Sequence, residues 1–267
     1  MDERIVNLYM KNGFEWINYS PNELMVSQAA RQLRDGEVVF VGIGLPNIAC
    51  NLARRLHAPN IVLIYESGAV GAEPERMPIS IGDPSLVTNS LSVCSMFDIF
   101  SYYLQGGLID VGFLQGAQID RFGNLNTTVI GDYHRPSVRL PGSGGACEIA
   151  IMAKRVLVIA PQTKRSFPTK IDFITSPGFV DGAGTRNKLG MPGKGPAIVI
   201  TDLGCYEFQA GEMTLTSVHP GCSVEQVRER IGWEVKEAPE LKTTDPPSID
   251  ELRLIREDLD PDHLYIK

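Results

Sequence analysis

Residues 37–65 read EVVFVGIGLPNIACNLARRLHAPNIVLIY, which is a strand, a helix and a second strand in succession. The apolar runs at 37–42 and 60–65 are short and rich in β-branched residues, as buried strands are, whereas apolar residues recur at helical spacing over 47–56. Two strands joined by a crossover helix lie parallel in one sheet. This stretch therefore predicts a parallel sheet with crossover helices.

The same alternation returns further along the chain. A strand is predicted over 109–114, a helix over 146–154 and a strand over 155–160. No internal repeat or low-complexity segment is present, which excludes solenoids and coiled coils. We therefore expect an α/β fold with a mainly parallel sheet and flanking helices.

The two ends of the chain differ in composition from this central part. Residues 1–22 are expected to form an N-terminal extension and residues 23–267 a single domain. From about residue 223 the sequence becomes polar and charged with helical periodicity, and Ser223 and Gln226 have the spacing of a capping box. A second helix is predicted from Ser248 to Leu259, so the domain is expected to end in a helical appendage.

Charge and composition exclude several classes of protein. The 267 residues include 25 Lys and Arg and 32 Asp and Glu, a net charge of −7, which argues against a nucleic-acid-binding protein. Hydrophobic residues make up 43% of the chain, as in ordinary globular proteins, so the chain is expected to bury a core without disulfide bonds. Five scattered cysteines with no C-x-x-C pair indicate neither a disulfide framework nor a zinc site.

The sequence shows no segment that targets or spans a membrane. Its first residues lack the basic start and apolar stretch of a signal peptide. The longest apolar runs are far shorter than the ~20 residues that cross a bilayer. We therefore expect a reduced, cytoplasmic protein with no membrane partner.

Two candidate sites follow the strands of the opening stretch. Gly42 and Gly44 precede a helix whose first turn holds Pro46, so backbone N–H groups there would stabilise an anion or an oxyanion. A dinucleotide fingerprint would need glycine where the chain has Asn47, so NAD binding is not supported. A tight turn without a ligand fits the same spacing. Glu66, at the end of the next strand, lies where ligands bind in open α/β sheets, but without further context the residues favour a surface glutamate that simply ends the strand.

Further candidates lie in the second half of the pattern. Gly142-Ser-Gly-Gly-Ala146 precedes a predicted helix, where successive N–H groups can form a concave nest; a flexible surface loop is the alternative. Ser67 and Ser143 invite a hydrolase interpretation, but neither lies in a Gly-x-Ser-x-Gly motif. The four histidines have no metal-binding spacing, and we interpret each as a capping or surface residue: His57, His134, His219 and His263.

Taken in order, six motifs resemble the beta subunits of family I coenzyme A (CoA) transferases, in particular those of the glutaconate type. The resemblance covers residues 23–260, nearly the whole chain. Its motifs are Gly42-Ile-Gly-Leu-Pro46, Glu66-Ser-Gly68, Gly116-Ala-Gln-Ile-Asp120 with Gly123-Asn-Leu-Asn126, Gly131-Asp-Tyr133, Gly142-Ser-Gly-Gly-Ala146 and Lys170-Ile-Asp-Phe-Ile-Thr-Ser-Pro-Gly178.

The resemblance implies roles for individual residues. In that family the glutamate of the Glu-Ser-Gly motif is the catalytic nucleophile, which here is Glu66, and it carries CoA as a glutamyl-CoA thioester. The glycine-rich loops, here Gly42 and Gly44 together with Gly144, Gly145 and Ala146, would bind the oxyanion or CoA. The family also implies CoA as a co-substrate, no permanently bound cofactor and no metal. A separate alpha subunit is expected, in an alpha2beta2 assembly with the active site at the subunit interface, so that the isolated chain is inactive.

Two other functions remain open at this stage. One is a CoA-thioester hydrolase that uses Glu66 as a general base, and the other is a non-catalytic CoA-binding module. The acyl group is open as well: a dicarboxylate, a short fatty acid or a degradation intermediate of a larger ring all agree with the sequence. Residues 121–194 carry 11 Lys and Arg against 4 Asp and Glu, and we expect the CoA phosphates to be attracted there by Arg139, Lys164, Arg165 or Lys170.

Overall fold

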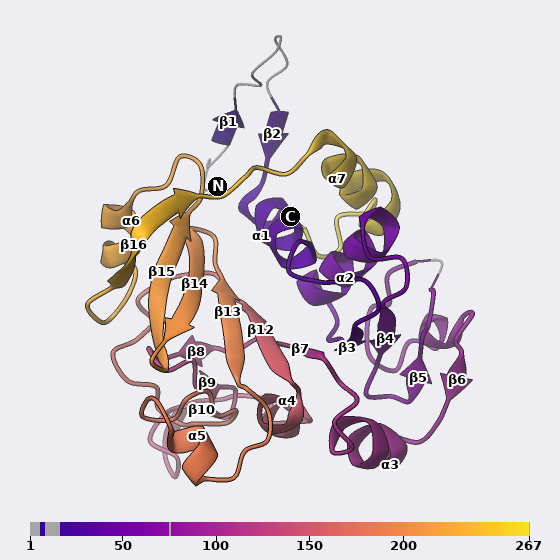
Figure 1. Ribbon diagram of the computed structural model, residues 1–267, viewed down its shortest axis with the longest axis horizontal. Coiled ribbons are helices and arrows are strands. Elements are labelled where there is room, and N and C mark those ends of the chain that lie inside the picture. Colours follow the sequence, from indigo (N-terminus) through magenta and orange to yellow (C-terminus); the bar gives the residue numbers. More distant parts are fainter. Residues whose placement is uncertain (1–5, 9–16, 75, 267) are drawn as a thin grey trace.

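A computed structural model describes residues 6–8, 17–74 and 76–266, and within them one large sheet organises the fold (Figure 1). It has ten strands in the order β16-β15-β14-β13-β12-β7-β3-β4-β5-β6. From one edge to the other these are β16 (Lys236–Thr243), β15 (Glu212–Val218), β14 (Gly204–Gln209), β13 (Pro196–Ile200), β12 (Arg155–Ile159), β7 (Val111–Leu114), β3 (Val38–Phe40), β4 (Val62–Ile64), β5 (Ala69–Val70) and β6 (Ser92–Val93).

The centre of the sheet is parallel. Strands β13, β12, β7, β3 and β4 all run in the same direction, whereas β14 and β15 on one side and β5 and β6 on the other pair antiparallel. The prediction of a mainly parallel sheet with flanking helices is thus confirmed. Because the parallel strands end at one edge, the loops that follow β3, β4 and β7 lie side by side.

The unit predicted from the opening stretch is present. Helix α2 (Leu45–Leu56) joins β3 to β4, and β3 and β4 pair in parallel register. Helix α4 (Ala146–Met152) precedes β12 in the second unit. Gly112 in β7 allows α4 to pack closely on the sheet, because a β-carbon there would lie 2.4 Å from Cγ2 of Ile149.

Helices cover both faces of the sheet (Figure 1). On one face, α1 (Pro21–Ala30), α2 and the C-terminal turn η3 (Leu254–Leu259) pack over alternate strand residues such as Val39 and Leu63. Helix α7 (Ile249–Arg253), which leads into η3, packs through Leu252 against Leu24 of α1. On the other face, α4 and the turn η2 (Ile99–Leu104) pack near Phe40 and Ile64, and the short helix α3 (Met96–Asp98) leads into η2. Val39 and its neighbour Phe40 pack into different cores, as do Leu63 and Ile64, because successive side chains of a strand point to opposite faces of the sheet.

The C-terminal segment contains a strand as well as helices. Helix α6 (Val224–Glu229) begins at Ser223 with the capping box that its sequence predicts, and α7 with η3 spans the second predicted helix. Between them, the unpredicted strand β16 pairs parallel to β15 at the sheet edge. Most of its side chains are exposed, and charged residues with a proline suit an edge strand, which explains the absence of an apolar alternation.

Smaller elements complete the described chain. Strands β1 (Val6–Leu8) and β2 (Ile17–Tyr19) form a pair, as do β8 (Gln118–Ile119) with β9 (Leu125–Asn126), and β10 (Val129–Gly131) with β11 (Pro136–Arg139). The remaining turns are η1 (Pro84–Val87) and α5 (Thr185–Lys188). Residues 1–5 and 9–16, most of the expected N-terminal extension, lie outside the described residues.

Candidate active site

Glu66 lies in the tight turn between β4 and β5, at the carboxyl end of β4. The N–H of Gly68 donates to the carbonyl of Tyr65, and the N–H of Tyr65 donates to the carbonyl of Ala69, at 3.0 Å each. Gly68 has a φ of 112°, and a β-carbon at this position would lie 2.0 Å from the carbonyl oxygen of Cys94. The turn that presents Glu66 thus requires glycine two positions later.

The Glu66 carboxylate is half-buried against the start of α4. A β-carbon on Gly145 would lie 3.2 Å from Oε2 of Glu66 and 2.3 Å from Cζ of Phe100, so both side chains press against the glycine. No hydrogen-bond donor to Glu66 is found within residues 17–74 and 76–266. Desolvation raises the pKa of this carboxyl group above its ordinary value.

The loop after β3 brings free N–H groups to the same edge. The N–H of Val41 donates to the carbonyl of Ile64 at 2.9 Å, which holds the end of β3 beside the end of β4. Gly44 is the N-cap of α2 with φ 92° and ψ −143°, a conformation that is essentially restricted to glycine. In the described chain, the N–H groups of Gly42 and Gly44 donate to no protein group. They are available to a ligand.

The loop before α4 supplies some, but not all, of its predicted donors. Gly142 is tied to Thr127, since its N–H donates to the Thr127 carbonyl and its carbonyl accepts from Thr127 Oγ1. The N–H of Ala146 donates to the carbonyl of Ser143 at 2.8 Å, so it is already engaged. The N–H groups of Gly144 and Gly145 have no acceptor in the described part of the chain.

A buried polar network that the sequence reasoning missed anchors the Glu66 turn to α2. The Tyr65 hydroxyl donates to Oδ1 of Asn47 at 2.7 Å, and Nδ2 of Asn51 donates to the same oxygen at 3.0 Å. Arg54 extends the network, donating to Oδ1 of Asn51 and to the carbonyl of Ala72. The turn is therefore held on both sides of Glu66. The signal in the sequence that could have revealed this network is the pair of asparagines, one helical turn apart, among the apolar residues of α2.

Other sequence candidates have structural roles. The Asp120 carboxylate accepts hydrogen bonds from the N–H groups of Phe122 and Asn124 and from Nδ2 of Asn124, which closes a turn. Ser67 and Ser143 are exposed and show no partner base. Among the residues that the structure describes, no group of His, Cys, Asp and Glu could hold a metal ion.

One histidine departs from its interpretation as a capping or surface residue. His219 is buried, with Nδ1 2.8 Å from Oγ1 of Thr244 and Nε2 2.8 Å from the carbonyl oxygen of Thr201. Desolvation lowers its pKa to about 4, so the ring is neutral at physiological pH and donates to the Thr201 carbonyl. The imidazole ring can be buried because both of its nitrogens have hydrogen-bond partners.

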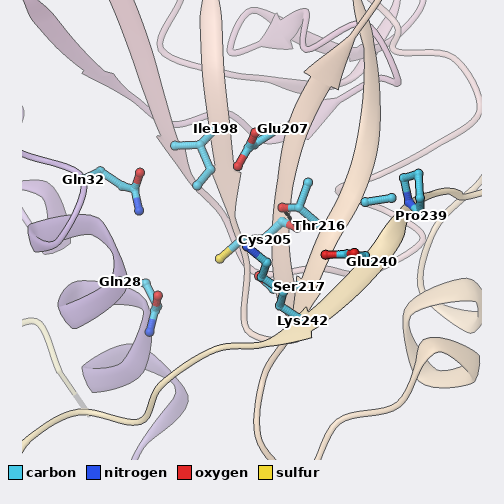
Figure 2. A pocket seen from close by; sticks show the side chains of 11 residues that line it. Gln28, Gln32, Ile198, Cys205, Glu207, Thr216, Ser217, Pro239, Glu240 and Lys242 are labelled. Carbon is cyan, nitrogen blue, oxygen red and sulfur yellow. Dashed lines mark hydrogen bonds between the residues drawn. The ribbon is translucent and has the colours of Figure 1, made fainter.

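A cavity of about 530 Å³ lies away from these candidates, between α1 and strands β13 to β16 (Figure 2). Gln28 of α1 faces Cys205 and Ser217 of the sheet across it. Its lining includes neither Glu66 nor any of the candidate glycines. Over the described residues, no helix has the length and apolar character needed to cross a membrane.

Comparison with known proteins relates most of the chain to one family. The family model described as coenzyme A transferase matches residues 23–230. The chain is 54% identical over 240 residues to the B subunit of 3-oxoadipate CoA-transferase from Pseudomonas knackmussii, covering 89% of this chain and 92% of that protein. It is 38% identical over 263 residues to the B subunit of glutaconate CoA-transferase from Acidaminococcus fermentans, covering 95% and 97% respectively.

Solved structures share the architecture. The glutaconate coenzyme A-transferase of Acidaminococcus fermentans superimposes with a TM-score of 0.88 at 36% identity, over 95% of this chain and 99% of that one. The decarboxylase AibA/AibB follows with a TM-score of 0.80 at 26% identity, over 92% and 97%.

Proposed function

The chain belongs to the coenzyme A transferase family, and we propose that it is the beta subunit of an enzyme that moves CoA between an acyl-CoA and a carboxylic acid through Glu66. The observation that carries this proposal is the position of Glu66 at the sheet edge, where its half-buried carboxylate has no hydrogen-bond donor among the described residues and lies beside unpaired N–H groups. A carboxylate left without donors retains its lone pairs for attack on an acyl carbon.

The proposed reaction is a double displacement. Glu66 attacks the thioester carbonyl of the acyl-CoA, the C–S bond breaks, and CoA leaves as a thiolate from a mixed anhydride. The thiolate then attacks the Glu66 carbonyl, releasing the donor acid as its carboxylate and forming a glutamyl-CoA thioester. The acceptor carboxylate attacks this thioester to form a second anhydride, and the thiolate attacks the acceptor carbonyl, which frees Glu66. No metal or redox cofactor enters these steps.

Each attack develops negative charge on a carbonyl oxygen. The unpaired N–H groups of Gly42 and Gly44, and those of Gly144 and Gly145, are the donors that we assign to this oxyanion or to CoA. Ala146 was predicted with them, but its N–H already donates to Ser143 and would have to be released first. Phe100, packed against Gly145, helps to exclude water that would hydrolyse the thioester.

We propose a dicarboxylic acid as the acceptor. The two relatives described above are named for 3-oxoadipate and glutaconate, which are both dicarboxylates. Because the chain matches both over about nine-tenths of its length or more, an acid of this class is the first to test. An assay that offers both acids, with acetate as the monocarboxylate comparison, reads this preference directly.

We further propose that an alpha subunit completes the enzyme in an alpha2beta2 assembly, since both relatives are named as the B subunits of their enzymes. The surface beside the Glu66 turn supports a partner there. Large apolar side chains are exposed within one short stretch that begins just before β6 and includes Cys94, whose carbonyl lies close to Gly68. Leu91 is 78% exposed, Phe97 67% and Tyr102 65%. Exposed apolar patches of this kind mark protein interaction sites.

Trapping of the intermediate tests the mechanism. The complex is incubated with acyl-CoA, treated with borohydride, which reduces a thioester to an alcohol, and analysed by peptide mass spectrometry. We expect the reduced product at Glu66 in the natural enzyme and none in Glu66→Gln, whose kcat should fall by roughly a thousandfold or more. Glu234→Gln, which removes an exposed carboxylate, is the matched control and should leave both readouts unchanged.

The two alternative functions give different results in the same experiment. A hydrolase that uses Glu66 as a general base releases CoA into water without an acceptor acid and yields no trapped glutamyl product. A non-catalytic CoA-binding module binds CoA but shows no turnover when the alpha subunit is present. Either result would contradict the proposed transfer.

A further inference from the structure

The ring of Phe100 is an aromatic neighbour of the Glu66 carboxylate. A β-carbon on Gly145 would lie 2.3 Å from Cζ of Phe100, 2.6 Å from Cε1 of the same ring and 3.2 Å from Oε2 of Glu66. The ring edge and the carboxylate oxygen are thus separated by no more than the sum of two short distances. A group that reacts with Glu66 at the start of α4 has Phe100 beside it.

Phe100 is carried by a π-helical turn. In η2 the N–H of Gln105 donates to the carbonyl of Phe100 at 3.0 Å, five residues back. Turns of this kind are rare and often lie at functional sites. Ile99 and Leu104 of the same turn are fully buried, whereas the Phe100 side chain is only partly buried. Ile99 and Leu104 therefore anchor the turn, and part of the Phe100 ring remains open to a substrate.

The segment that leads into η2 is bonded to the turn that carries Glu66. Strands β5 and β6 pair with each other, and the N–H of Cys94, directly after β6, donates to the carbonyl of Gly68 at 3.0 Å. A capping box at Ser95 then starts α3, which leads into η2. Because these contacts begin two residues after Glu66, they fix the position of Phe100 relative to the carboxylate.

A second phenylalanine supports the ring. Phe40 of β3 is buried, and its ring centroid lies 5.5 Å from that of Phe100 with an angle of 56° between the rings. Phe100 is therefore held by Phe40 and by the close approach to Gly145. Closely packed side chains resist displacement, so the ring forms a rigid wall next to Glu66.

We propose that Phe100 is a specificity-determining residue, which selects acyl groups whose carbon next to the thioester carbonyl is unbranched. The inference rests on the proposed function, in which Glu66 attacks that carbonyl. For the attack, the carbonyl carbon must come within about 3–3.5 Å of a carboxylate oxygen. The oxyanion that forms needs N–H donors, and those of Gly144 and Gly145 have no acceptor in the described part of the chain. Both requirements place the reacting carbon at the start of α4, beside the ring.

A branch next to the carbonyl is the part of the acyl group that this wall would exclude. The carbon that bears the branch is one bond, about 1.5 Å, from the reacting carbon, so it cannot leave the neighbourhood of Phe100. Carbons further along the chain can turn away from the ring. A single methyl group in a closely fitting pocket changes kcat/KM by about 10–200-fold. We therefore expect the enzyme to discriminate against branched donors and to accept straight chains of different lengths.

Two acyl-CoA donors that differ by one methyl group test this inference. The complex with the alpha subunit is assayed with succinyl-, glutaryl-, adipyl- and butyryl-CoA as donors and glutaconate as the acceptor. The donor used best is then compared with its derivative that carries a methyl group on the carbon next to the thioester carbonyl. We expect kcat/KM of the natural enzyme to be at least about tenfold higher for the unbranched donor, and Phe100→Ala to lower this ratio about tenfold.

Two further variants separate the size of the side chain from its packing role. Phe100→Leu retains an apolar side chain of intermediate volume and should give an intermediate ratio. Phe208→Ala is the matched control, because it removes a half-buried phenylalanine from β14, which four strands separate from β4, and it should keep the natural ratio. Both donors are assayed with the same preparation, so a loss of folded enzyme cancels in the ratio.

The outcomes separate this inference from the proposed function. The inference is wrong if the natural enzyme uses both donors equally, or if Phe100→Ala keeps the natural ratio or lowers both values of kcat/KM by the same factor. It is also wrong if Phe208→Ala changes the ratio as much as Phe100→Ala does. In each of these cases CoA transfer through Glu66 would stand. If the natural complex transfers CoA from none of the donors and no glutamyl-CoA is trapped, the proposed function itself fails.

Discussion

The carboxylate of Glu66 lies directly against Gly145, although 79 residues separate them in the chain. A β-carbon on Gly145 would approach Oε2 of Glu66 to 3.2 Å and collide with the Phe100 ring at 2.3 Å. Glycine at the N-cap of α4 is therefore what allows the Glu66 carboxylate and Phe100 to meet there. Within the described part of the chain, the N–H groups of Gly144 and Gly145 have no acceptor, so in the proposed reaction this glycine has a chemical role as well as a steric one.

Gly145→Ala should lower transferase activity strongly. The added methyl group must displace Phe100, shift Glu66 or move the start of α4, and misplacement of a reacting group by about 1 Å can cost about a hundredfold in rate. We expect kcat to fall by about that factor, while overpacking lowers the free energy of unfolding by roughly 1–3 kcal/mol.

Steady-state kinetics and thermal unfolding of the purified complex check this prediction. Gly82→Ala is the control, because its β-carbon would have Ser80 Oγ at 3.8 Å as its nearest neighbour and its φ is not positive. Natural activity in Gly145→Ala would show that Glu66 reacts without the geometry described here.

Gly68→Ala should destabilise the fold far more than Gly36→Ala. Both glycines have positive φ, 112° and 79°, but only at Gly68 does a β-carbon meet a neighbour, the Cys94 carbonyl oxygen at 2.0 Å. We expect the free energy of unfolding to fall by about 1 kcal/mol in Gly36→Ala, from the backbone conformation alone, and by several times that value in Gly68→Ala. Urea unfolding of the two variants measures the difference. Equal losses would mean that the segment after β6, which carries Cys94, moves aside at little cost.

Glu66→Gln should stabilise the protein at neutral pH. Desolvation raises the pKa of Glu66 in the folded state, so the folded state holds this proton more tightly than the unfolded state does. Stability contributed by protonated Glu66 is therefore present at low pH and is lost as the pH rises through the raised pKa. Replacing the ionised group should raise Tm at pH 7 and have little effect on Tm near pH 4. The control Glu234→Gln should leave Tm unchanged at both pH values.

The rate of CoA transfer should rise with pH as Glu66 ionises, whereas the stability contributed by Glu66 falls. In the proposed reaction only the carboxylate form of Glu66 attacks, so the rate should rise with pH through an apparent pKa above that of an ordinary glutamate, about 4.3. The pH profile of kcat/KM at saturating acceptor acid measures it. A rate that is flat down to pH 4 would contradict the desolvated environment of Glu66.

His219 should make the fold sensitive to mild acid. Burial lowers its pKa to about 4 in the folded state, whereas an unfolded histidine titrates near 6.5. The unfolded state binds the proton more tightly, so stability falls as the pH drops from 6.5 to 4, by about 3 kcal/mol in total. The stability of His219→Gln, measured by urea unfolding at several pH values, should depend less on pH over this interval. Exposed His134→Gln should retain the natural slope.

Much of the fold could be predicted from local patterns. Two β-branched runs around an amphipathic helix predicted β3, α2 and β4, and the structure places these elements within two residues of the predicted bounds. The predicted capping box at Ser223 is equally local, because a side chain and an N–H three residues apart define it. Strand β16 escaped prediction because an edge strand with exposed charges has no apolar alternation to detect.

The sequence by itself determined which residues end buried strands, and it therefore brought Glu66 and the glycines after β3 forward as candidates. Only the tertiary structure decided that Gly145 touches Glu66, that Tyr65 is bonded to Asn47, that the Ala146 N–H is engaged, and that Lys170 rather than Arg139 lines a cavity. Strands and caps depend on neighbours a few residues apart, which sequence periodicity records. Contacts between distant loops depend on how the crossovers place the sheet edge, and periodicity holds no record of that placement.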